Sequence, residues 1–324
     1  MLDLARTTVE RVLMRRTSLT VLSLTAALVL TGCGGGGDPL DADTEDTGSE
    51  TGAGTGDGAA TVVIGSANFP ENELLAEIYA AALSDAGVEV STTLNIGSRE
   101  TYMAGLQDGS IDLIPEYTGG LATYLNPEIT ATSPEDVLQE AQDNLPAGLQ
   151  LLEISEAEDK DALVVTRETA DELGLTSIAD LTDQAGDLVL GGPPEFETRP
   201  NGVAGLAEVY GVEFGSFRPL AAGSNLTVQA LVNGQVNAAN IFTTDPAIEE
   251  NDLVILEDPE SLFAAQNIVP LISSEVVNPA VEDALDAVSA ALTTENLTAM
   301  MVQVITEGQD PADVARQFVD ENLR

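Results

Sequence analysis

Histidine is absent from this chain of 324 residues, tryptophan is absent too, and there is one cysteine and one lysine. The missing histidine removes the commonest general base and the commonest transition-metal ligand. One thiol forms neither an internal disulfide nor a cysteine-rich metal site, and no acidic loop has the glycine turn and closing glutamate of a calcium site. We therefore expect that the protein binds no metal and no cofactor and is not an enzyme. A hydrolase would be left with carboxylate or Ser/Lys chemistry, and Lys160 is its only lysine.

Basic residues are also scarce: 11 Lys and Arg stand against 55 Asp and Glu, a net charge of −44. Residues 1–32 hold four of the arginines and two of the acids, so the remainder carries −46. A chain this acidic repels nucleic acid and anionic lipid, and we exclude both as partners. Its surface suits high external salt, where the repulsion is screened.

The N-terminal segment has the pattern of an export signal. All four arginines of residues 1–32 precede the uncharged apolar stretch Leu19–Leu30, which is shorter than the roughly 20 residues that a spanning helix needs. The run Leu30–Cys33 resembles a bacterial lipobox, which implies a signal peptide over residues 1–32 and a lipid on Cys33. A buried free cysteine is the alternative reading. The pair Arg15-Arg16 leaves twin-arginine export open beside the general route.

Residues 33–60 predict a flexible tether. They are mostly Gly, Asp, Thr and Glu, and such a segment buries too little apolar surface to offset its ordering entropy. Lipid, tether and folded domain in this order indicate an extracytoplasmic protein, anchored to the outer face of the cell membrane through Cys33 and not spanning it.

From residue 61 onward, short apolar runs alternate with helical patterns. Val62–Ile64 is followed by a helical pattern over Glu71–Asp85 that stops at Gly87, and after Ile268–Ile272 the chain is helical to its end. This alternation indicates an α/β protein with largely parallel sheets. The other expected strands are Val88–Ile96, Ile111–Ile114, Ala162–Val165, Leu188–Leu190, Val236–Ile241 and Leu253–Leu256. The helical tail has two apolar stripes, first Val281, Leu285, Val288 and Leu292, then Leu297, Met301, Val304 and Ile305.

One pattern occurs twice. Leu106–Thr118 and Leu231–Asp245 each contain a helix end, a glycine turn, a strand, and a loop with an aromatic residue and hydroxyls. Ligands of open α/β sheets bind just beyond the carboxyl ends of strands. The folded part is long enough for two lobes, and two such loops, one from each lobe, would face each other across a cleft. The alternative is a chance likeness between two ordinary αβ units.

Several collinear motifs resemble those of the osmoprotectant-binding proteins of ABC importers, the receptors for glycine betaine, choline and carnitine. They are Ile64–Asn72, Gly109–Gly119, Glu195–Gly202, Phe242–Asp245 and Glu307–Ala315. The resemblance implies a two-lobed fold of the periplasmic-binding-protein type (type II), with a hinge between the lobes and a ligand cleft at their interface. It also implies that lobe 1 is discontinuous: residues 61–161 form its first part, 162–265 form lobe 2, and 266–324 return to lobe 1.

In that family, aromatic faces enclose a quaternary ammonium, and basic and hydroxyl groups hold a carboxylate. By resemblance, Tyr117 and Phe242 match cage aromatics and Arg199 matches the anion-binding arginine. The remaining candidate donors are Ser66, Asn68, Thr118 and Thr243. We interpret Arg99 as structural, paired with Glu100 or a neighbour.

Three positions depart from the family pattern. Ala67 stands where relatives have lysine, and Asp161 and Val203 stand where tyrosines are expected. Asp161 could face an amine or guanidinium, or neutralise a quaternary cation, or be a hinge residue that faces water. Candidate replacement aromatics are Phe69, Tyr102 and Phe196.

The resemblance thus implies capture of a small zwitterionic or cationic osmoprotectant by a monomer, which delivers it to an ABC permease and its ATPase. Two alternatives remain: the same fold binding a different amine or amino-acid-like solute, and a ligand-sensing lipoprotein without a transport role.

Overall fold

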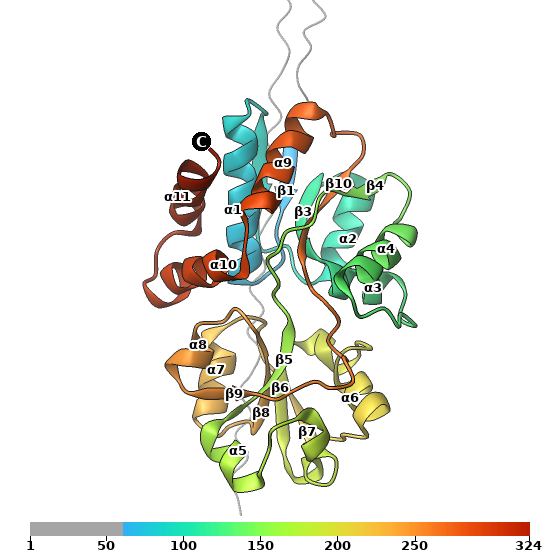
Figure 1. The fold of residues 1–324 in the computed structure, drawn as a ribbon, viewed down its shortest axis with the longest axis vertical. Coiled ribbons are helices and arrows are strands. Elements are labelled where there is room, and N and C mark those ends of the chain that lie inside the picture. Colours follow the sequence, from blue (N-terminus) through green and yellow to red (C-terminus); the bar gives the residue numbers. More distant parts are fainter. Residues whose placement is uncertain (1–60) are drawn as a thin grey trace, which may run out of the picture. The chain divides into compact units, whose positions relative to one another are not determined.

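The computed structural model describes residues 61–324, and within them the chain forms two five-stranded sheets, each covered by helices (Figure 1). The signal peptide predicted over 1–32, Cys33 and the tether over 33–60 lie outside the described residues. No helix of residues 61–324 combines the length and the apolar character needed to cross a membrane.

The first sheet has the order β2-β1-β3-β10-β4, so it combines four early strands with one that comes late in the chain. Its central strands are buried because their side chains are apolar on both faces, as Ile64, Leu113 and Leu271 are. The strands are β1 (Val62–Gly65), β2 (Val90–Thr93), β3 (Leu113–Tyr117), β4 (Leu149–Leu151) and β10 (Ile268–Ser273).

The second sheet repeats this arrangement in the order β7-β6-β8-β5-β9. Its strands are β5 (Asp161–Thr166), β6 (Val189–Gly192), β7 (Ser216–Pro219), β8 (Ala238–Phe242) and β9 (Leu253–Ile255). The chain therefore leaves the first sheet between β4 and β5 and returns to it between β9 and β10.

The expectation of largely parallel sheets is wrong, since each sheet has two parallel and two antiparallel strand pairs. The cause is the path of the crossing segments. Strand β10 starts where β3 ends, with Ile268 opposite Tyr117, and β5 starts where β8 ends, with Asp161 opposite Phe242. A strand that enters a sheet at the exit of its neighbour must run antiparallel to it.

Helix α1 (Pro70–Asp85) begins with a proline in its first turn, where the missing N–H costs nothing, and carries Glu71 and Glu73 at its positive end. It lies beside the late helices α9 and α11 (Figure 1), and buried side chains of all three helices form one core. Arg316 of α11 pairs with Asp85 of α1 at 2.8 Å. The other helices of this lobe are α2 (Arg99–Asp108), α3 (Thr118–Leu125), α4 (Pro134–Asp143), α9 (Pro279–Ala291), α10 (Thr294–Met301) and α11 (Pro311–Asn322). The second lobe has α5 (Arg167–Leu173), α6 (Val203–Tyr210), α7 (Asn225–Val232) and α8 (Ala247–Glu250).

The first apolar stripe expected in the helical tail is fully buried in the core of the first lobe. The second is buried only at Leu297 and Met301, while Val304 and Ile305 stay half-exposed. The reason is a π-helical turn over Val302–Thr306, whose wider winding rotates later side chains away from the stripe.

The repeated sequence pattern has a structural counterpart in the two lobes. Asp112, just before β3, accepts a hydrogen bond from the Val63 amide at 2.8 Å and donates its own amide to the Val63 carbonyl at 2.7 Å. Asn237, just before β8, makes the same two bonds with Val189, at 2.9 and 2.8 Å. In both lobes one side chain thus fixes the start of a central strand against its parallel neighbour.

Candidate functional site

A cavity of about 600 Å³, counted to its open mouth, lies where β3 and β8 end and where the two crossing segments run. Both lobes and the crossing segments contribute to its wall. The lining residues are Ala67, Asn68, Phe69, Ser98, Arg99, Tyr102, Tyr117, Gly120, Asp159, Asp161, Pro193, Glu195, Arg199, Ala222, Phe242 and Gln266. No cluster of three or more metal-ligand side chains occurs within the described part of the chain.

Three aromatic rings form one side of this cavity. Tyr117 ends β3, Phe242 ends β8, and Phe69 precedes α1. The ring centroid of Phe69 is 5.9 Å from that of Tyr117 and 5.1 Å from that of Phe242, with tilted planes. The structure therefore brings the two predicted cage aromatics together, with Phe69 between them.

Of the other two replacement aromatics, Tyr102 reaches the cavity and Phe196 does not. Phe196 is 1% exposed and packs in the core of the second lobe. Val203, at the expected position of a tyrosine, also packs against that core. Ala67, at the expected position of a lysine, lines the cavity and brings no charge to it.

A buried group of acids adjoins Tyr117. Its hydroxyl donates to Glu71 Oε1 at 2.9 Å, and the Thr244 hydroxyl donates to Glu71 Oε2. Asp159, which lines the cavity, shares a hydrogen bond with Glu71 and accepts one from the Thr244 amide at 3.2 Å. Burial and the adjacent Glu71 raise the pKa of Asp159 well above its usual value, and burial raises the pKa of Glu71. Burial and mutual repulsion thus favour the protonated form in both carboxyl groups.

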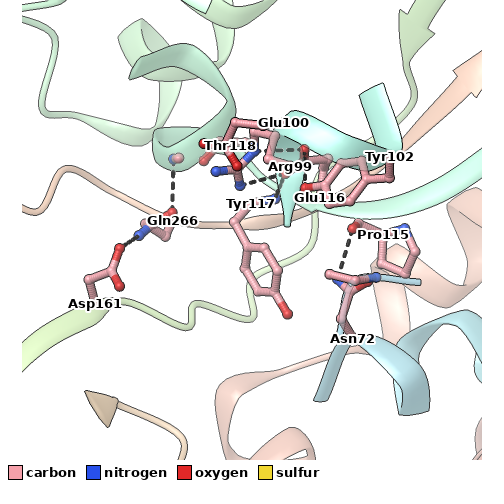
Figure 2. A network of polar contacts seen from close by, with 12 residues as sticks. Asn72, Arg99, Glu100, Tyr102, Pro115, Glu116, Tyr117, Thr118, Asp161 and Gln266 are labelled. Carbon is pink, nitrogen blue, oxygen red and sulfur yellow. Dashed lines mark hydrogen bonds and ion pairs between the residues drawn. The ribbon is translucent and has the colours of Figure 1, made fainter. Parts of the chain in front are cut away.

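Asp161 lies in the cavity wall at the start of β5, surrounded by amide donors. It accepts hydrogen bonds from Asn240 at 3.0 Å, Asn201 at 3.2 Å and Gln266 at 3.3 Å. Figure 2 shows Gln266 as the link between Asp161 and the backbone of α3, where Gly120 donates its amide to Gln266 Oε1 at 2.9 Å. The carboxylate is thus held in place at the cavity wall.

Two arginines reach the same cavity. Arg199 pairs with Glu100 of the other lobe at 3.1 Å. Although burial opposes the effect, the hydrogen bond from Arg199 lowers the pKa of Glu100 to about 2. This pair places a cation in the wall, at 23% side-chain exposure, and ties it to an acid across the two lobes.

Arg99 does not pair with Glu100, and its partner is Glu116 of β3. Its Nε and Nη2 donate to the two carboxylate oxygens at 2.9 and 2.8 Å (Figure 2). Glu116 is fully buried and also accepts from the Tyr102 hydroxyl at 2.7 Å and the Tyr117 amide at 2.9 Å. Burial alone would lower the pKa of Arg99, but the attraction of Glu116 outweighs it and raises that pKa.

The predicted donors divide into two groups. Asn68 is exposed and lines the cavity. Ser66, Thr118 and Thr243 do not line it, because their hydroxyls are bonded elsewhere. Ser66 bridges the Ala67 carbonyl and Asn95 amide, Thr118 bridges the Ala265 carbonyl and Asn267 amide, and Thr243 bridges Asp159 and the Lys160 amide.

The chain resembles several characterised proteins over most of its length. It is 29% identical over 278 residues to the glycine-betaine-binding protein of Pseudomonas aeruginosa, covering 82% of this chain and 88% of that protein. It is 25% identical to the glycine betaine-binding protein YehZ of Escherichia coli K12, covering 81% and 91%. A solved structure of a glycine betaine/carnitine/choline ABC transporter superposes with a TM-score of 0.63 at 22% identity, covering 80% of this chain and 98% of that one, which supports the two-lobed fold of periplasmic binding proteins.

The family model for the substrate-binding domain of ABC-type glycine betaine transport systems matches residues 60–321, which is nearly the whole of the described part. This chain therefore belongs to that family of transporter substrate-binding domains.

Proposed function

We propose that this protein captures a small solute with a quaternary ammonium group, such as glycine betaine, outside the cytoplasm and delivers it to an ABC permease. The observation that carries the proposal is the aromatic side of the cavity, where the ring of Phe69 lies 5.9 Å from that of Tyr117 and 5.1 Å from that of Phe242, in a chain with only 4% aromatic residues. A quaternary ammonium donates no conventional hydrogen bond, and ring faces attract such a cation without requiring one.

Two charged side chains in the cavity wall also support a zwitterionic quaternary ammonium compound as the ligand. Asp161 lies opposite Phe242 in the pairing of β5 with β8, and it carries a negative charge where the family has a ring. Arg199 provides a positive group in the same cavity for the carboxylate of a zwitterion. The candidate binding residues are therefore Tyr117, Phe242, Phe69, Asp161, Asn68 and Arg199, with Ser66, Thr118 and Thr243 in supporting positions behind the wall.

The rest of the proposal concerns the setting of this site. The protein is a non-catalytic monomer that a lipid on Cys33 and the segment 33–60 hold at the membrane. Capture then depends on closure of the two lobes about the crossing segments, where Glu158 and Asn267 form an antiparallel bridge.

Calorimetric titration of the full chain tests the proposal. The panel is glycine betaine, proline betaine, choline, carnitine, ectoine and arginine, at low and high salt. We expect saturable binding of at least one quaternary ammonium compound, and loss of affinity in Tyr117→Ala and Phe242→Ala. Binding of arginine alone, with no quaternary ammonium bound, would contradict the proposal and indicate that Asp161 directs the site toward hydrogen-bonding cations.

A further inference from the structure

We propose that Arg99 is a contact for the ligand's carboxylate, and that it makes the site select betaine-type zwitterions over quaternary ammonium compounds without a carboxylate, such as choline. This inference rests on the proposed function and names the ligand class within it. Arg99, which the sequence indicated to be structural, would then have two roles: one edge of its guanidinium pairs with Glu116 and the other binds the ligand.

The hydrogen bonds of Arg99 leave one edge of its guanidinium unused. Nε and Nη2 donate to Glu116, whereas Nη1 has no hydrogen-bond partner among residues 61–324. The side chain is only 10% exposed and lines the cavity. A guanidinium carries five N–H donors in a rigid plane, so an edge not directed at Glu116 is available to a second carboxylate.

Glu116 does not depend on Arg99 alone. It also accepts from Tyr102 and from the Tyr117 amide, so its two oxygens receive four hydrogen bonds. These contacts fix the guanidinium in one position before any ligand arrives. A cation held in advance loses little conformational entropy on binding, which favours affinity for the anion it meets.

Gly120 gives this guanidinium its place in the wall. A Cβ at position 120 would lie 2.7 Å from Nη2 of Arg99, closer than a Cβ normally approaches another atom, and 3.0 Å from Nη1, which is also tight, so the guanidinium would have to move. The absence of a side chain therefore lets the guanidinium of Arg99 approach the first turn of α3 closely. Figure 2 shows the two hydrogen bonds from Arg99 to Glu116 that hold the guanidinium there.

The neighbouring positions leave room for this role. Ala67 lines the cavity without a charge, so the first lobe supplies no lysine there, and Arg99 is its one arginine in the wall. Arg199 comes from the second lobe and is more exposed at 23%; like Arg99 it uses Nε and Nη2 on one acid, which for Arg199 is Glu100 of the other lobe. Arg99, Gly120 and Arg199 also border an adjoining pocket, so both arginines lie at the junction of the two spaces.

The test compares affinities for glycine betaine and choline, measured by calorimetry on the full chain. Gly120→Ala displaces the guanidinium and keeps its charge. Arg99→Gln combined with Glu116→Gln removes both charges together, so no buried carboxylate is left unpaired. Gly186→Ala is the matched glycine control, since a Cβ there meets nothing within 4 Å, and Arg167→Gln is the matched arginine control on an exposed ion pair.

We expect Gly120→Ala to weaken glycine betaine about fivefold and the double variant to weaken it about tenfold or more, as for loss of a charge-assisted hydrogen bond. The affinity of these variants for choline should change less than about twofold, and so should the affinity of both control variants for either ligand. Thermal melting identifies any variant that has lost its fold, and a double variant that fails to fold leaves Gly120→Ala to decide.

The other outcomes have separate meanings. Equal losses for both ligands would mean that the substitutions alter cavity shape, and unchanged affinity for glycine betaine would mean that Arg99 makes no ligand contact; either overturns the inference and leaves the proposed function standing. If the wild type binds glycine betaine but not choline, the affinity of Gly120→Ala for glycine betaine is compared with that of Gly186→Ala. A loss in Gly120→Ala alone supports the contact with Arg99, and equal affinities overturn it. If the wild type binds neither, the proposed function fails and this inference fails with it.

Discussion

Glu71 and Asp159 are two buried carboxyl groups joined by a hydrogen bond, with Tyr117 and Thr244 as other partners of Glu71 and Asp245 nearby. Two adjacent carboxylates cannot both ionise cheaply in a buried site, so one of them stays protonated. Glu71 belongs to α1 of the first lobe and Thr244 to the second, so this pair of carboxyl groups lies where the lobes and a crossing segment meet.

This arrangement predicts a stability that falls as pH rises. The pKa of Asp159 is raised in the folded state, and an unfolded chain releases that proton near pH 4. Above pH 4 the native state therefore binds more protons than the unfolded state. The contribution of Asp159 to the free energy of unfolding then decreases as pH rises, until pH exceeds the pKa of Asp159 in the folded protein. Asp159→Asn imitates the protonated acid and should gain stability relative to the wild type as pH rises.

Urea unfolding of both proteins between pH 4 and 9 checks this. The difference in free energy of unfolding should be smallest near pH 4, grow with pH, and then level off. Taking the difference cancels the general effect of the acidic surface, which the two chains share. A difference that is constant across this range would mean that Asp159 is ionised in the folded protein.

The motif match made the positions of four candidate residues predictable: Tyr117, Phe242 and Asp161 lie at strand ends, and Arg199 lies in the turn before α6. The pairing of Arg99 with Glu116 could not be predicted, since they are 17 residues apart and their contact depends on how α2 packs against β3. Ser66, Thr118 and Thr243 were expected as ligand donors for their hydroxyls. In the structure these hydroxyls hydrogen-bond to nearby groups of the protein instead, and the sequence does not show which groups those are.

At the scale of elements, the two lobes use the same device to position a central strand. Asp112 and Asn237 are both half-buried, and each side-chain oxygen accepts from the amide of the neighbouring strand. An Asp and an Asn are interchangeable in this role, because only an acceptor oxygen is used. The difference between the two side chains in the repeated pattern therefore does not change the structure.

We predict that Asp112→Asn and Asn237→Asp are nearly neutral, whereas Asp112→Ala and Asn237→Ala each cost about 1 kcal/mol, the net value of one such hydrogen bond. Urea unfolding measures all four variants against the wild type. If the exchanges cost as much as the alanine substitutions, charge rather than the shared hydrogen bond would be what matters at these positions.

The elements themselves were largely predictable, but their pairing was not. Apolar runs such as Val62–Ile64 and Ile268–Ile272 became strands because few other conformations bury such residues on both faces. The direction of β5 and β10 depends on where the chain crosses between lobes, which no local pattern encodes. The π-helical turn at Val302–Thr306 was missed for a similar reason, since its sequence fits an ordinary helix.

At the scale of the whole molecule, the dominant feature is a net charge of −44, against which the described residues form few ion pairs with basic partners. Most acidic side chains therefore repel one another through solvent. Repulsion of this kind destabilises the compact state at low ionic strength and is reduced as salt shortens the Debye length to about 3 Å at 1 M.

We predict that the thermal midpoint rises steeply with NaCl at low concentrations and then flattens toward about 1 M, where screening is nearly complete. Sodium sulfate gives the control: its exclusion from the protein surface strengthens burial in proportion to concentration, so its curve should keep rising after the NaCl curve has flattened. A midpoint that rises linearly with NaCl from the start would attribute the stabilisation to burial instead. In that case the acidic surface would set solubility without limiting the stability of the fold.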